Sequence, residues 1–226
     1  SWLERRFVVP EVAGSNPVDR PIFSPIMAVH QSILGTRCMT AFWTEADFDD
    51  HELVEVVRDA KSGLTAIIAL HSTHLGPGAG GTRFWHYAEP ADAMRDALRL
   101  SRGMSYKNAM ADIPLGGGKS VIWGNARTDK SPDLFRAFGR AVNSLQGQYT
   151  TAEDVGVSVA DMEIVREETP YVAGLDKGKA VSGDPSPVTA KGIFLGLHET
   201  AKRALGTDDL SGKTVAVQGV GHVGSY

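Results

Sequence analysis

The sequence predicts an α/β fold with much parallel sheet. Short apolar runs of strand length, such as residues 64–70, alternate with longer segments whose apolar residues recur at helical spacing, such as 90–104 and 131–145. Glycine-rich and proline-rich stretches separate the two kinds of segment, as at 76–81. Strands that alternate with helices favour βαβ units, in which helices pack on the faces of a parallel sheet.

The first third of the chain contains one well-defined strand. Residues 1 to about 45 carry several prolines, and we interpret them as an irregular arm with one strand at 26–29. The continuous apolar run LTAIIAL at 64–70 has the length of a buried strand. Glycines and a proline then predict a loop at 76–81.

The middle of the chain predicts two helices and a short strand. Pro90 is well placed as the first residue of a helix, which we expect to end at Gly103. Residues 116–118, all glycine, predict a turn that leads into a strand at 121–123. Ser131 and the following proline begin the second helix. Its buried face is expected to consist of Leu134, Phe135, Phe138, Val142 and Leu145.

Two further helices are predicted by their terminal residues. Ser158 and Asp161 have the spacing of a capping box, for a helix that contains Met162 and Val165. Another helix begins at the Ser-Pro pair 186–187 and ends at Gly206. The polar stretch 174–183 between these helices is expected to be a hinge between two domains.

A glycine motif after these helices predicts a dinucleotide site. Residues 214–218 (TVAVQ) have the composition of a strand, and the pattern G-x-G-x-x-G follows at 219–224. Such glycines allow a tight turn and the close approach of a pyrophosphate to a helix N-terminus. The alternative is a tight turn without function. The acidic residue that separates NAD from NADP is expected about 20 residues further on, beyond Tyr226.

Composition excludes several classes of protein. The 226 residues are 42% hydrophobic and 22% charged, and the formal net charge of -4 argues against nucleic-acid binding. No apolar run approaches the roughly 20 residues that cross a bilayer. The sole cysteine, Cys38, predicts a reducing cytoplasm and a structural role. We expect no metal site, because metal-ligand spacing is missing from His30, His71, His74, His86 and His198.

Two lysines and one carboxylate are candidates for chemistry. Lys119 follows three glycines, which favours a narrow, poorly solvated slot; the P-loop alternative is rejected because Ile113 stands where that motif needs glycine. Lys107 lies among apolar residues, and two lysines in one buried pocket would lower each other's pKa and leave one neutral as a general base. Asp154, in TAEDVG, is either a reacting carboxylate or a helix-start residue.

Five motifs in order resemble those of the glutamate/leucine/phenylalanine/valine dehydrogenase family, most nearly its leucine and phenylalanine branch. They are LGPGAGGTRFW (75–85), GMSYKNAMA (103–111), PLGGGKSVI (114–122), TAEDVG (151–156) and SGDPSPVTAKG (182–192). The resemblance covers about residues 55–226. It implies a substrate-binding α/β domain at 1–180, followed by the start of a Rossmann dinucleotide-binding domain at 181–226.

The resemblance implies an oxidoreductase that reversibly deaminates an apolar L-amino acid to its 2-oxo acid and ammonia. The implied cofactor is NAD, with NADP not excluded, and the implied partners are the small-molecule substrate and further copies of the chain in a homo-oligomer. Ala79 stands where leucine dehydrogenases usually have leucine, which implies a roomier pocket. GGGK leans toward the phenylalanine branch and TAEDVG toward the leucine branch, so both aliphatic and aromatic substrates stay open.

The site residues carry over by motif. Lys107 matches the lysine that binds the substrate carboxylate, and Lys119 matches the catalytic lysine that activates water. Asp154 matches the residue that exchanges protons with the amino group, and Gly81 matches a glycine whose backbone approaches the substrate. The cofactor-binding residues implied by the last two motifs are Thr189, Gly219, Val220, Gly221 and Gly224.

Two alternatives remain open. One is a non-catalytic amino-acid-binding or assembly fragment of such an enzyme; a single strand and a glycine turn cannot bind a dinucleotide, so we expect no turnover from the 226 residues alone. The other is a different Rossmann-linked oxidoreductase, which would not need the pair of Lys107 and Lys119.

Overall fold

The computed structural model describes residues 41–175 and 185–226, and the two segments are described separately below. The strand expected at 26–29, Cys38 and most of the hinge expected at 174–183 lie outside the described residues. Of that hinge, Gly174 adopts a positive φ of 76°.

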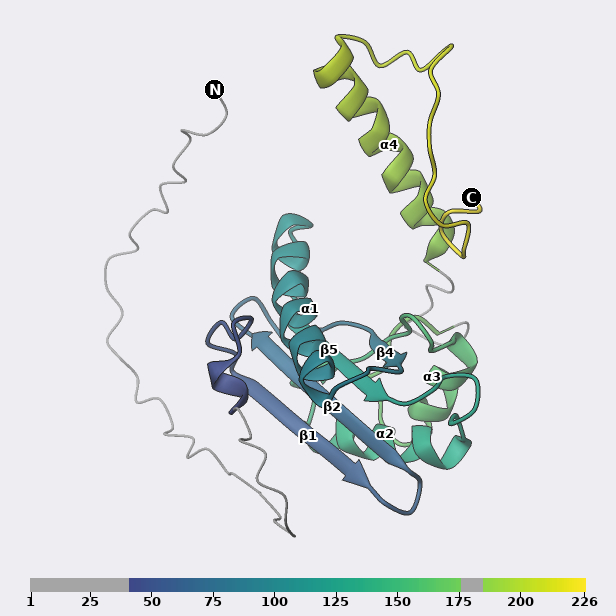
Figure 1. Cartoon of the computed structure of the whole chain (residues 1–226). Helices are drawn as coiled ribbons and strands as arrows, with labels where there is room; N and C mark the ends of the chain where they lie inside the picture. The colour runs from purple at the N-terminus through teal and green to yellow at the C-terminus, as the bar shows by residue number, and fades with distance from the viewer. Residues whose placement is uncertain (1–40, 176–184) are drawn as a thin grey trace, which may run out of the picture. The chain divides into compact units, whose positions relative to one another are not determined.

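Residues 41–175 form a mixed six-stranded sheet with helices on both faces (Figure 1). The strand order is β1-β2-β5-β3-β6, and β4 also pairs with β5. The strands are β1 (Leu53–Asp59), β2 (Leu64–Ser72), β3 (Gly78–Ala79), β4 (Thr82–Trp85), β5 (Gly116–Trp123) and β6 (Tyr149–Thr150). The helices are the 3-10 helix η1 (Phe42–Thr44), α1 (Pro90–Met110), α2 (Pro132–Ser144) and α3 (Val159–Arg166).

The fold class is α/β, as predicted, but the sheet is not mainly parallel. The long strands β1, β2 and β5 pair antiparallel, and parallel pairing is confined to the short strands β3, β4 and β6. A turn with Gly63 at φ 79° joins β1 to β2 as a hairpin, and a hairpin makes its two strands antiparallel. The sequence did not define β1, because this edge strand is only partly buried and lacks a continuous apolar run.

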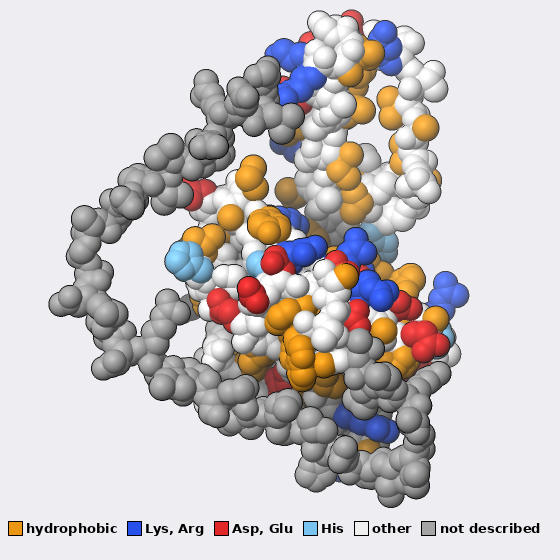
Figure 2. Space-filling view, turned by 60° about the vertical axis from the view of Figure 1, so that its left-hand side comes forward, with side chains coloured by type: hydrophobic (Ala, Val, Ile, Leu, Met, Phe, Trp, Pro, Cys, Tyr) orange, Lys and Arg blue, Asp and Glu red, His pale blue; other side chains and the backbone are white. Residues whose placement is uncertain are grey.

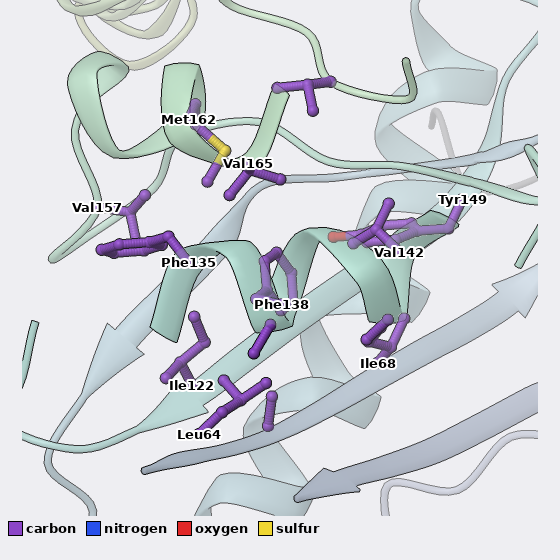
Figure 3. Packing of buried hydrophobic residues seen from close by; sticks show 14 of the residues in the cluster. Leu64, Ile68, Ile122, Phe135, Phe138, Val142, Tyr149, Val157, Met162 and Val165 are labelled. Carbon is purple, nitrogen blue, oxygen red and sulfur yellow. The ribbon is translucent and has the colours of Figure 1, made fainter. Parts of the chain in front are cut away.

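Both faces of the central strands are buried, which explains the unbroken apolar run at 64–70. Leu64, Ile68 and Ile122 face α2 in the larger core cluster, and α3 packs against the other side of α2 (Figure 3). Ile67 and Val121, on the opposite face, pack with residues of α1. A strand covered on both sides has no reason to alternate apolar and polar residues. The predicted buried face of α2 is confirmed, since the buried residues include Leu134, Phe135, Phe138, Val142 and Leu145.

Helix starts were predicted well because they depend on local hydrogen bonds. The side chain of Ser131 accepts from the backbone N–H of Leu134 at 3.2 Å, at the start of α2. Ser158 and Asp161 form the predicted capping box at the start of α3, where each side chain bonds the other's backbone N–H.

Helix α1 does not end at Gly103; it continues to Met110. Gly103 is exposed, and a glycine inside a helix costs about 1 kcal/mol relative to alanine. Packing of α1 along β5 offsets this cost, and near the helix end Asn108 Nδ2 donates to the backbone oxygen of Gly116 at 2.7 Å. The prediction was wrong because this stabilisation is tertiary, and Lys107 consequently lies in the last turn of α1.

The three glycines at 116–118 begin strand β5 and do not form a turn. A Cβ on Gly117 would lie 2.0 Å from Ser105 Oγ, and a Cβ on Gly118 would lie 2.8 Å from the ring of Tyr149. Glycine is therefore required here because α1 and β6 approach the strand closely. The predicted loop at 76–81 likewise contains a short strand, β3, which pairs with β5 and β6.

Residues 185–226 contain helix α4 (Ser186–Leu205), which begins and ends as predicted, with Gly206 in the left-handed conformation at φ 74°. The prediction of a strand at 214–218 is wrong, because the structure has no strand within residues 185–226. Val215 and Val217 are exposed, and within 185–226 there is no neighbouring strand to which residues 214–218 could hydrogen-bond.

Across the two described segments, no helix is both long enough and apolar enough to span a bilayer. On the face shown in Figure 2, basic and acidic side chains of the described residues are interspersed.

Candidate active site

Lys119 and Asp154 are 35 positions apart in the sequence and form a hydrogen-bonded ion pair. Lys119 lies on the central strand β5 and is only 6% exposed. Its Nζ donates to Asp154 Oδ2. Asp154 follows β6 in a segment that runs beside β3 and β4, where Thr82 N donates to Ala152 O at 2.8 Å. Asp154 is thus not a helix-start residue, because α3 begins only at Val159.

Glycines bring these segments within contact distance. A Cβ on Gly80 would lie 1.8 Å from the backbone oxygen of Gly118 on β5. A Cβ on Gly81 would lie 2.3 Å from the backbone oxygen of Glu153 and 3.0 Å from Asp154 Cβ. The backbone at 80–81 therefore lies directly beside the ion pair, which explains the structural need for this pair of glycines.

A second cation, Arg83 on β4, approaches the same carboxylate. Its Nε lies 3.5 Å from Asp154 Oδ2, and its Nη1 donates to Asp96 Oδ2 at 2.7 Å. Tyr87 OH donates to the same oxygen of Asp96 at 2.5 Å. The site is therefore a chain of alternating charges that runs from β5 to α1.

Burial sets the protonation behaviour of the pair. Burial lowers the pKa of the Lys119 ammonium below its usual 10.5, and attraction to Asp154 offsets only part of this effect. Burial acts to raise the pKa of the Asp154 carboxyl, but the charge and hydrogen bond of Lys119 outweigh it, so this pKa is lowered. A lysine in this position loses its proton more readily than a surface lysine, which suits a general base.

Four buried hydroxyl groups lie behind the ion pair. Tyr149 OH donates to the backbone oxygen of Gly80 at 2.6 Å and lies 2.9 Å from Ser120 Oγ. Thr82 Oγ1 lies 2.7 Å from Ser120 Oγ and 2.5 Å from Thr151 Oγ1. The network connects β4, β5 and β6 and fixes the backbone beside the glycines. Burial raises the pKa of Tyr149 to about 12, so its hydroxyl stays protonated.

Replacing Tyr149 with phenylalanine is expected to lower the free energy of unfolding by about 1–3 kcal/mol, because the buried oxygen of Gly80 loses its donor. Urea denaturation of the chain measures this difference. Tyr106→Phe is the control, since Tyr106 is 61% exposed and should change stability by less than about 0.5 kcal/mol. Equal effects of the two substitutions would contradict a stabilising role for the hydroxyl network.

Lys107 departs from the sequence-based expectation. It lies in the last turn of α1, and its side chain is exposed rather than buried in a pocket shared with Lys119. Apolar neighbours in sequence misled here, because several of them, such as Tyr106 and Met110, are themselves exposed at this end of the helix. Ala79 lies on β3, half-buried and paired with Gly117 and Thr150.

The expected cofactor-binding residues lie in the segment 185–226. Thr189 is an exposed residue in the first turn of α4. The motif at 219–224 forms a turn in which Gly219 has φ 90°. A Cβ on Gly224 would lie 2.1 Å from the backbone oxygen of Gly219, so the turn is tight. Within the described residues, no group of three or more His, Cys, Asp or Glu is arranged to hold a metal ion.

Sequence reasoning missed the second half of the charge chain. Arg83 follows the glycine pair in GGTR, and Asp96 lies one turn into the apolar stripe of α1. Neither residue has a local signal, since charged residues next to turns and on helices are usually exposed. The one usable signal was the position of Asp96 among the residues of α1 that face the sheet, because a carboxylate there needs a cation partner.

Comparison with known proteins identifies relatives for this site. A family model described as Glu/Leu/Phe/Val dehydrogenase, dimerisation domain, matches residues 51–171. Leucine dehydrogenase of Bacillus subtilis (strain 168) is 56% identical over 174 residues, which are 77% of this chain and 48% of that protein. Valine dehydrogenase of Streptomyces virginiae is 50% identical over 181 residues, 80% of this chain and 51% of that protein.

A solved structure has a similar fold. L-tryptophan dehydrogenase from Nostoc punctiforme superposes with a TM-score of 0.59 and 43% identity, covering 77% of this chain and 49% of that one. The chain spans about half the length of the curated relatives that it matches.

Proposed function

The chain belongs to the Glu/Leu/Phe/Val dehydrogenase family, and from that premise we propose that it carries the reacting groups of an enzyme that oxidatively deaminates an apolar L-amino acid. The single observation that supports this proposal most strongly is the buried ion pair of Lys119 and Asp154. Loss of hydride from an α-carbon requires a neutral amine, and water attack on the resulting imine requires a base, so the reaction needs a lysine with a lowered pKa.

Each site residue has a proposed task. The exposed ammonium of Lys107 binds the substrate carboxylate. Lys119 takes a proton from the attacking water, and Asp154 exchanges protons with the substrate amino group. The backbone at Gly81 approaches the substrate, and Ala79 bounds the space for its side chain.

The proposed division of the chain is a substrate-binding domain at 1–180 and the start of a dinucleotide-binding domain at 181–226. The family match at 51–171 falls within the first domain. The proposed cofactor is NAD, which would supply hydride chemistry when bound. The support for this cofactor is the glycine pattern itself; a Cβ on Gly219 or Gly221 would meet nothing within 4 Å, so no described atom crowds these two positions. Val220, Gly224 and Thr189 complete the proposed cofactor-binding residues.

The substrate is proposed to be an apolar amino acid, aliphatic or aromatic. The relatives named leucine, valine and L-tryptophan dehydrogenase support this class. A small residue at Ala79 is compatible with either type of side chain. The family description as a dimerisation domain supports a homo-oligomer assembled through the first domain, which light scattering of the purified protein would measure.

The test is a substrate screen on the full-length protein that contains this chain. Absorbance of the reduced nicotinamide is followed with leucine, valine, isoleucine, phenylalanine and tryptophan, each with NAD and with NADP. Turnover of at least one of them is expected, and inactivity toward all five would refute the proposal. Binding of amino acids without turnover would instead favour a non-catalytic module.

A further inference from the structure

Asp154 Oδ2 is shared between two cations. Lys119 Nζ donates to this oxygen, and Arg83 Nε lies 3.5 Å from it. Arg83 Nε is a buried atom without a hydrogen-bond partner among the described residues. Arg83 therefore acts on Asp154 mainly through its charge, whereas Lys119 also forms a hydrogen bond.

Arg83 is fixed from its other side by α1. Its Nη1 donates to Asp96 Oδ2 at 2.7 Å, and the side chains of Arg83 and Asp96 are 24% and 26% exposed. Tyr87 OH holds the same oxygen of Asp96 at 2.5 Å. An arginine held in this way cannot move toward or away from Asp154 as a free side chain would, and it keeps its proton at any pH that the protein survives.

We infer that Arg83 is a positioning residue that holds the Asp154 carboxylate and competes with Lys119 for it. Attraction to Asp154 favours the charged form of Lys119, and a second cation on the same oxygen weakens that attraction and repels the ammonium directly. Among the described residues, the Asp96 carboxylate on α1 favours the charged form of Lys119, and the hydroxyl of Tyr149 on β6 is neutral. Arg83 thus helps Lys119 to become a base, and this role in turnover rests on the proposed function.

The test is the titration of Lys119 in the 226-residue chain, followed by NMR of lysine labelled with ¹³C at Cε, with Lys119→Ala used to assign the signal. Arg83→Met is expected to move the midpoint of Lys119 to higher pH. Arg83→Lys keeps the charge and is expected to leave the midpoint close to that of the wild type, although it loses the forked contact with Asp96. Arg136→Met is the matched control, because Arg136 forms exposed ion pairs with Asp133 on α2 and with Glu167 directly after α3.

The inference is overturned if Arg83→Met leaves the midpoint unchanged, or if Arg136→Met moves it as far. If Arg83→Met does not fold, the double variant Arg83→Gln, Asp96→Asn removes one charge of each sign. The midpoint should still move upward, but less far, because the lost Asp96 carboxylate favoured the charged form of Lys119. The titration requires no turnover, so an inactive full-length protein would refute the proposed function and leave this result standing. In an active protein, Arg83→Met should move the acidic limb of the kcat/KM profile to higher pH, and Arg83→Lys should restore it.

Discussion

Replacing Lys119 with alanine in the full-length protein is expected to lower kcat for deamination by about 10²- to 10⁴-fold, the usual contribution of a general base. The lost ammonium also removes the side-chain hydrogen-bond donor of Asp154 and leaves it the backbone N–H of Val155. Steady-state rates with the best amino acid of the substrate screen measure this loss. Lys61→Ala is the control, since Lys61 is an exposed lysine in the turn between β1 and β2 and should leave kcat unchanged.

The lowered pKa of Lys119 predicts the direction in which the deamination rate changes with pH. A base must be neutral to act, and burial lowers the pKa of Lys119 from 10.5. Thus kcat/KM for deamination should rise with pH through this lowered pKa and level off above it. Lys119→Ala should lose that limb of the profile, and added methylamine should restore part of the rate. A variant with the wild-type rate would exclude the proposed role.

Replacing Gly80 with alanine is expected to lower the free energy of unfolding by about 3 kcal/mol or more. We expect this to be the largest loss of stability among glycine-to-alanine substitutions in the site. The added Cβ would lie 1.8 Å from the backbone oxygen of Gly118, and neither backbone can yield without disturbing β3 and β5. Urea denaturation followed by circular dichroism measures the loss.

Gly103→Ala is the matched control for this substitution. Gly103 lies inside α1, and a Cβ there meets nothing within 4 Å. The higher helix propensity of alanine should raise stability by up to about 1 kcal/mol. If both substitutions had small effects, the close approach of Gly80 to β5 would not be real.

Local signals in the sequence were sufficient where a structure depends on neighbouring residues. The capping box of Ser158 and Asp161 and the left-handed stop at Gly206 each involve groups within a few positions, and both were predicted correctly. The strand at 64–70 was equally clear, because burial on both faces leaves an unbroken apolar run.

Local signals failed where packing between distant segments decides the structure. The glycines at 116–118 indicate a turn by composition, yet they pair with β2 and β3 as a strand. Glycine is required there because α1 and β6 leave no room for side chains. Gly103 indicates a helix end, yet packing on β5 carries α1 past it. The contact of Lys119 with Asp154 joins positions 35 apart, and the residues alone could offer it only as one of several alternatives.

The uninterrupted course of α1 has a mechanical consequence. Asp96 and Lys107 are 11 residues apart on one helix, which places them about 16 Å apart along the axis and within about 20° of the same side. Asp96, which holds Arg83, and Lys107, which is proposed to bind the substrate carboxylate, therefore lie on a single continuous helix. If substrate binding at Lys107 shifted α1, the same shift would move Asp96 and its contact with Arg83.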